Sequence, residues 1–283
     1  MPIEHISDTA RWVAVYRAME TARPDALFRD PFAERLAGAK GEEIVSGIKQ
    51  GRQMAWSMIV RTAIFDEIIM EKIQGGDVDT VLNLAAGLDA RAWRLPLAAS
   101  LRWIDVDLPA ILDYKAEHLR DAKPKCRYET VALDLTDGAR RRALFSQIGS
   151  ESQRVLVVSE GLLIYLTEDQ AGQLATDMHG PASFRWWLID LASPRLLEWM
   201  TRRWGRSVEA GNAPFQFAPQ AGTAFFARFG WREVQYRSAM DEARRLRREM
   251  RLMWLWRFFM RISPKKKREE FRRFSGFVLL ERD

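Results

Sequence analysis

The chain has 283 residues, of which 47% are hydrophobic and 29% charged, and its formal net charge is +6. This composition excludes a disordered or collagen-like chain and is typical of a globular protein. The single cysteine, Cys126, excludes an internal disulfide and fits the reducing cytoplasm, where we expect the protein. No signal peptide is expected, and arginines interrupt the apolar stretches well before the roughly 20 residues of a membrane span.

Short aliphatic runs alternate with helical stretches along most of the chain, which favours βαβ units. Seven strands are expected, at 80–84, 101–105, 128–133, 154–159, 184–190, 231–236 and 276–280. Helical patterns lie between them, near 109–120, 138–148, 167–178, 194–204 and 218–229. This order predicts an open, mostly parallel sheet with helices on both faces.

Helical segments are added to this α/β core at two places. Residues 1–79 read as helices and form an N-terminal extension. Residues 237–273 carry 14 Lys and Arg against 5 Asp and Glu, so this one segment makes the protein basic. We expect a single domain over 1–283, in which 80–236 and 274–283 form the core.

The loops that follow the strands carry most of the information about a ligand, because ligands of open α/β sheets lie beyond the carboxyl ends of the strands. The turn after the first strand holds one glycine, Gly87, where a dinucleotide site would need three. The small residues Ala85, Ala86 and Gly87 let a ligand approach the backbone closely. This turn therefore fits a nucleoside without phosphates.

Carboxylates recur after successive strands. Asp105 and Asp107 end the second strand, and Asp107 follows Gly87 by 20 residues, a spacing at which an acidic side chain meets ribose hydroxyls. Asp134 follows the third strand, where a carboxylate can accept from an exocyclic amine, and Glu160 follows the fourth. Four carboxylates that converge on one site would suit a cationic ligand.

These motifs, in this order, resemble the leucine carboxyl methyltransferase family over nearly the whole chain. The segments that carry the resemblance are 7–10, 17–20, 27–31, 81–94, 105–109, 134–135 and 160–166. The resemblance implies a class I methyltransferase fold, which is Rossmann-like α/β. It also implies O-methylation with S-adenosylmethionine as the cofactor.

The resemblance further implies roles for single residues after the strands. Asp107 would bind the ribose hydroxyls of the cofactor. Asp134 and Leu135 would contact the adenine, and Glu160 would lie near the amino group of the methionine portion.

Two arginines and the first loop complete the implied cofactor site. Arg61 would hold the carboxylate of the cofactor, and Arg17 is a second candidate for the same task. Ala85 and Gly87 would contact the cofactor through their backbone, although Ala85 stands where the family usually has glycine.

The acceptor is predicted from the chemistry of the transfer. A carboxylate is ionised at neutral pH and needs no base, whereas a hydroxyl needs one. His5, His118 and His179 do not follow strands, which favours a carboxylate or an acidic hydroxyl on a small anionic or aromatic molecule. The resemblance to bacterial members of the family implies a polyketide-like product as one such acceptor. Tyr165 could border the path of the methyl group. No residues have the spacing of metal ligands, so no metal is expected.

The basic segment is expected to form a lid over an apolar acceptor pocket. Its apolar residues recur at helical spacing between the arginines, at Leu246, Met250, Met253, Trp254 and Phe258. A solvated helix face, a partner interface and, less favoured, an interfacial helix on an anionic membrane are the alternatives. No nucleic-acid motif accompanies the segment, so nucleic acid is not an expected partner.

Two alternative functions stay open at this point. One is a module that binds the cofactor without catalysis, since a fold does not fix a function. The other is a peripheral membrane methyltransferase that acts on an amphiphilic acceptor.

Overall fold

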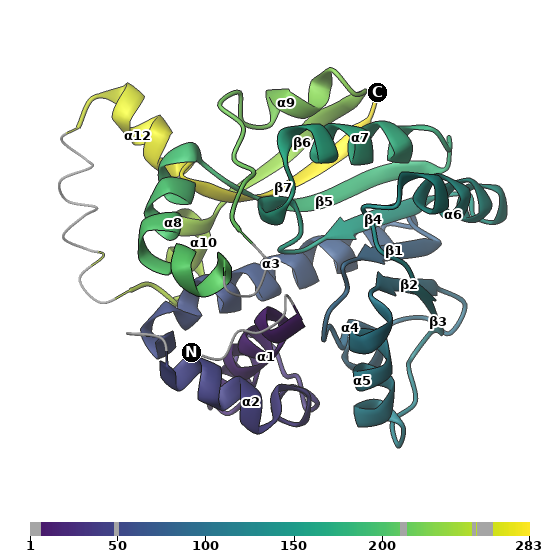
Figure 1. Ribbon diagram of the computed structural model, residues 1–283, viewed down its shortest axis with the longest axis horizontal. Helices are drawn as coiled ribbons and strands as arrows, with labels where there is room; N and C mark the ends of the chain where they lie inside the picture. The colour runs from purple at the N-terminus through teal and green to yellow at the C-terminus, as the bar shows by residue number, and fades with distance from the viewer. Residues whose placement is uncertain (1–6, 48–50, 210–213, 251–252, 254–262) are drawn as a thin grey trace.

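The computed structural model describes residues 7–47, 51–209, 214–250, 253 and 263–283. Its centre is a seven-stranded sheet with the order β3-β2-β1-β4-β5-β7-β6 (Figure 1). The strands are β1 (Thr80–Leu84), β2 (Arg102–Asp107), β3 (Arg127–Ala132), β4 (Val155–Ser159), β5 (Phe184–Ala192), β6 (Trp231–Ser238) and β7 (Ser275–Arg282). Strand β7 runs antiparallel to both of its neighbours, and the other pairs are parallel.

All seven expected strands are present, with ends that differ from the prediction by at most two residues. The central strands were the easiest to predict because they are buried along their whole length and therefore apolar. Chain order reverses between β1 and β4, since β1 pairs with β2 on one side and with β4 on the other. A ligand site is expected beyond the carboxyl ends of these two strands.

Helices cover both faces of the sheet, and a separate apolar core fills the space on each face (Figure 1). One core contains side chains of α1 (Ser7–Thr21), α2 (Ala33–Gly47), α3 (Ala55–Gln74), α4 (Arg91–Arg94), α5 (Pro109–Leu119) and α10 (Ala239–Arg245). The other contains side chains of η2 (Leu163–Tyr165), α6 (Gly138–Glu151), α7 (Glu168–His179) and α9 (Ala224–Ala227). The N-terminal helices are thus part of the main core.

Two further helices, α8 (Pro194–Glu209) and α12 (Lys265–Arg272), lie at the same end of the sheet (Figure 1). A short 3₁₀ helix, η1 (Gly51–Met54), leads into α3. Among the described residues, no helix is both long and apolar enough to cross a bilayer.

The predicted helix over 218–229 is wrong, because only the single turn α9 forms there. Pro219 and Gly222 explain the difference: proline has no backbone N–H to donate, and Gly222 has a φ of +56°, which ends a right-handed helix.

The basic segment is described only in part. Helix α10 follows β6. Pro264 stands directly before the first residue of α12, near the start of a helix, where proline is favoured. Trp254 and Phe258, which were expected on the apolar face of a lid, lie outside the described residues.

Candidate functional site

A cavity of about 1720 Å³ lies at the carboxyl ends of β1, β2, β4 and β5. This is the reversal point of the sheet, where open α/β folds bind their ligands. Of the residues that the sequence placed in the site, all but Asp105 line this cavity: Arg17, Arg61, Ala85, Gly87, Asp107, Asp134, Leu135, Glu160 and Tyr165. The fold thus brings these residues together, and the role of each stays a prediction.

Asp107 fixes the loop after β1 to the end of β2. Its Oδ2 accepts from the backbone N–H of Gly87 at 2.6 Å, and its Oδ1 accepts from that of Leu108 at 2.7 Å. Burial raises the pKa of Asp107 above its usual range, although the two N–H donors oppose this effect. Each carboxylate oxygen keeps a second lone pair, so Asp107 can also accept from a pair of ribose hydroxyls.

The loop after β1 adopts left-handed backbone at two residues, with a φ of +52° at Ala85 and +51° at Gly87. A Cβ atom at Gly87 would lie 3.2 Å from the Cβ of Ala10 in α1, so glycine also relieves crowding there. At Ala85 the same conformation is strained, because a side chain disfavours a positive φ. The strain explains why a glycine would be the ordinary choice at this position.

Asp134 forms a tight turn after β3, because its Oδ1 accepts from both the backbone N–H and the hydroxyl of Thr136, at 2.8 and 2.7 Å. The carbonyl of Leu135 accepts from Arg141 at 2.5 Å. The turn holds the half-buried Leu135 side chain against the cavity.

Asp105 does not belong to the cavity, so the expected convergence of four carboxylates is wrong for this residue. It lies two residues below the end of β2 and is only 1% exposed. Its carboxylate accepts from Lys115 at 2.5 Å, Tyr128 at 2.8 Å, Trp103 at 2.8 Å and Asn83 at 3.0 Å. These four donors satisfy a buried charge within the protein.

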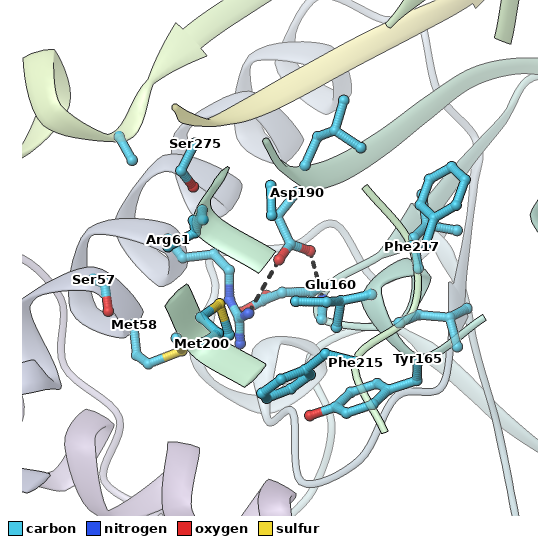
Figure 2. A pocket seen from close by; sticks show the side chains of 18 of the residues that line it. Ser57, Met58, Arg61, Glu160, Tyr165, Asp190, Met200, Phe215, Phe217 and Ser275 are labelled. Carbon is cyan, nitrogen blue, oxygen red and sulfur yellow. Dashed lines mark hydrogen bonds and ion pairs between the residues drawn. The ribbon is translucent and has the colours of Figure 1, made fainter. Parts of the chain in front are cut away.

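Arg61 of α3 joins two carboxylates in the middle of the cavity. Its Nε donates to Glu160 Oε1 at 3.0 Å, and its Nη1 donates to Asp190 Oδ2 at 3.2 Å. Figure 2 shows the Arg61 guanidinium facing the Asp190 carboxylate. Burial lowers the pKa of Arg61, but the charges of Asp190 and Glu160 raise it by more. The guanidinium therefore stays charged and keeps donors for a further anion.

Sequence reasoning missed Asp190, which lies near the carboxyl end of β5. Its Oδ1 accepts from the backbone N–H of Gly161 at 2.6 Å, so it connects β5 to the loop after β4. The available signal was the same as for the other strand ends: an acidic residue that closes an apolar strand.

Arg91 of α4 was also missed, although it contacts the expected site directly. It is 3% exposed, and its Nη1 lies 2.7 Å from Glu160 Oε2 and 2.8 Å from Asp89 Oδ2. Its Nε donates to Asp66 of α3 at 2.6 Å. Both oxygens of Glu160 therefore face an arginine, one from each side.

Arg17 of α1 is committed to the protein itself. Its Nε donates to Asp30 at 2.9 Å, and its Nη2 donates to the carbonyl of Leu88 at 2.5 Å. This arginine anchors the loop after β1 to the N-terminal helices, which makes Arg61 the better placed of the two for the carboxylate of a ligand.

The sequence profile of the leucine carboxyl methyltransferase family matches residues 10–179. The chain belongs to the leucine carboxyl methyltransferase family. The family predicted from the sequence is thereby confirmed.

Similar proteins agree with this assignment. A Mycobacterium sp. (strain JLS) protein is 30% identical over 265 residues, which cover 83% of this chain and 86% of that protein. A Streptomyces coelicolor protein is 37% identical over 171 residues, which cover 57% and 60% of the two chains. The names of both assign them to the S-adenosyl-L-methionine-dependent methyltransferases. The expected cofactor, S-adenosylmethionine, is confirmed as that of the family.

Solved structures support the fold. A DUF574 family protein from Streptomyces avermitilis covers 97% of both chains with a TM-score of 0.62 at 12% identity. A protein from Thermobifida fusca, titled as a methyltransferase, covers 96% of this chain and 94% of its own with a TM-score of 0.58 at 13% identity. The class I methyltransferase fold is confirmed.

In this member of the leucine carboxyl methyltransferase family, neither described histidine lines the cavity. The Nδ1–H of His118 donates to the carbonyl of Tyr114 in its own helix, and His179 packs edge-on against Trp231. His5 lies outside the described residues. Tyr165 does line the cavity, and burial raises the pKa of its phenol, so this side chain is a neutral hydrogen-bond donor at neutral pH.

Proposed function

We propose that this protein transfers a methyl group from S-adenosylmethionine to a carboxylate or an acidic hydroxyl of a small molecule, such as a polyketide-like product. The observation that carries the proposal is that no described residue of the cavity lining is a histidine, while the carboxylates at the strand ends are bound by arginines or backbone N–H groups, as Asp107, Glu160 and Asp190 are. An acceptor that is already ionised needs no general base, whereas an alcohol or an ammonium would need one. We further propose that the reaction takes place in the cytoplasm.

The cofactor would lie along the carboxyl ends of β1, β2 and β4. Asp107 would accept from the ribose hydroxyls, and Asp134 and Leu135 would border the adenine. Arg61 would pair with the carboxylate of the methionine portion, and Glu160 would accept from its ammonium. S-adenosylmethionine itself supplies the electrophilic methyl group.

The protein's contribution is position and the exclusion of water. Arg61 is held between Glu160 and Asp190, so it can fix the methionine end of the cofactor without a change of rotamer. Tyr165 and Phe215, whose ring centroids are 5.7 Å apart, form an aromatic wall beside it (Figure 2). Aligning the acceptor oxygen with the methyl group against such a wall supplies much of the rate enhancement in a direct displacement.

Methyl-labelled cofactor and a set of aromatic and aliphatic carboxylates, phenols, alcohols and amines test this proposal by mass spectrometry. We expect label on carboxylates or phenols. Mild base separates the two, because it releases label from a methyl ester and leaves an aryl methyl ether intact. Label found only on amines would contradict the proposal, and cofactor binding without any transfer would favour a binding module.

A further inference from the structure

The charged side chains that line the cavity are divided by sign along the molecule. Among the described residues, the end formed by α1, α3 and the strand termini carries Arg17 and Arg61 against Asp89, Asp107, Asp134, Glu160 and Asp190. The end formed by α8, α12 and the residue after α12 carries Arg195, Arg203, Lys267 and Arg273 against Glu270. We call them the acidic end and the basic end, and their net charges are −3 and +3.

The acidic end is explained by the proposed cofactor. S-adenosylmethionine carries a sulfonium and an ammonium against one carboxylate, so an acidic surrounding complements it. The basic end has no such explanation, because the implied cofactor contacts all come from the acidic end. The inference below therefore rests on the proposed function, and it concerns the second substrate.

The cavity is large enough for a second ligand. Its volume of about 1720 Å³ exceeds the roughly 300–1,000 Å³ of a site for one small molecule. Met58, Met200, Phe215 and Phe217 surround the middle of the cavity (Figure 2). Methionine is flexible and polarizable, so this wall can pack against an apolar body of irregular shape.

The cations of the basic end differ in how much of their charge is used inside the protein. Arg195 lies 3.1 Å from Glu270, which joins α8 to α12, and Arg273 lies 3.0 Å from Glu233. Lys267 is exposed and forms no ion pair with any described residue. Its ammonium is therefore a positive charge of this end that is available to a ligand.

We propose that the methyl acceptor is an anionic amphiphile. Its apolar body lies against the methionine and aromatic wall, and an anionic group lies at the basic end beside Lys267. The apolar contact supplies most of the affinity because it removes area from water, whereas the exposed cations select the sign of the charge and attract the acceptor from solution.

A matched pair of fluorescent probes separates the apolar contribution from the anionic one. 1-Anilinonaphthalene-8-sulfonate and N-phenyl-1-naphthylamine share one apolar body, and only the first carries a sulfonate. Both are titrated into the full chain in the presence of saturating S-adenosylhomocysteine, which fills the acidic end. We expect the anionic probe to bind at least about fivefold more tightly, in keeping with a few charge contacts of ordinary strength.

Two lysines of the same helix provide the matched variants. Lys267→Gln removes the charge that lines the cavity, and we expect it to weaken the anionic probe about threefold and to leave the neutral probe unchanged. Lys265→Gln makes the same change on an exposed residue of α12 that does not line the cavity, and it should leave both probes unchanged. Phe215→Ala should weaken both probes alike.

The proposal is overturned if the two probes bind equally to the wild-type chain, or if Lys265→Gln and Lys267→Gln act equally. Equal effects together with sedimentation of the chain on anionic phospholipid vesicles would identify the basic end as a membrane surface instead. Calorimetry with S-adenosylhomocysteine alone tests the proposed function separately. Failure to bind it removes that function, whereas binding with no preference between the probes removes only the anionic acceptor.

Discussion

The acidic and basic ends of the cavity are built on opposite principles. At the acidic end the central charges are buried and paired: the side chain of Arg61 is 11% exposed and contacts Glu160 and Asp190. Arg91, which contacts Glu160 from outside the cavity lining, is 3% exposed and also contacts Asp66 and Asp89. At the basic end the charges are exposed: the side chain of Arg195 is 77% exposed although it pairs with Glu270. Buried pairs hold one geometry, whereas exposed charges act through a screened field. One end is therefore suited to a ligand of fixed shape and the other to a more variable one.

The largest expected effect comes from breaking the buried pairs of the acidic end. Arg91→Met leaves the buried Asp89 without its cation and removes one of two arginines from Asp66 and from Glu160, and we expect it to lower the free energy of unfolding by about 3–5 kcal/mol. Arg195→Met at the basic end should lower it by less than about 1 kcal/mol, because that pair is exposed. Urea denaturation of the two variants measures the difference, and equal losses would contradict the contrast between the ends.

Cofactor affinity should depend on the acidic end alone. Asp107→Ala removes a charged acceptor from a largely buried position, so we expect S-adenosylmethionine and its demethylated product to bind about tenfold to a hundredfold more weakly. Glu270→Ala, which removes a carboxylate from the basic end, should leave both affinities unchanged. Calorimetry decides the matter: an unchanged affinity in Asp107→Ala would remove this residue from the ribose site.

Arg61 belongs to the acidic end, and a comparison of two ligands tests which part of the cofactor it contacts. Arg61→Met should weaken S-adenosylmethionine about tenfold, since a hydrogen-bonded charge pair is lost. The same variant should weaken methylthioadenosine, which lacks the amino-acid portion, by less than about twofold. Equal losses for the two ligands would give Arg61 a structural task in place of a contact with the cofactor carboxylate.

The smallest expected effect concerns backbone strain at the acidic end. Ala85→Gly should raise the free energy of unfolding by about 0.5–1 kcal/mol, because glycine adopts a φ of +52° without steric cost. Ala86→Gly in the same loop should lower it, since Ala86 is not in the left-handed region and glycine only adds freedom to the unfolded chain. A loss of stability in Ala85→Gly would show that the strain is offset by contacts of the methyl group.

The sequence predicted the sheet well because polar turns bound its strands and because the buried strands appear in the sequence as short apolar runs. It predicted the helix over 218–229 wrongly, because local apolar spacing there was stronger than the signal of Pro219 and Gly222. The prediction of a four-carboxylate site was wrong at Asp105 for a different reason. Two residues on one face of a strand can lie at different depths, and the sequence does not show that Asp105 is buried against Lys115 and Tyr128.

The sequence by itself determined the family, the order of the strands along the chain and the residues that follow each strand, because these depend on local patterns. The tertiary structure alone decided which charges meet. Arg61 pairs with Asp190, and Arg91 pairs with Asp66 and Glu160, although these residues are too far apart in the sequence for a local pattern to predict the pairs. The division of the cavity into an acidic and a basic end has the same origin, since it arises only when helices α8 and α12 are placed beside the ends of the strands.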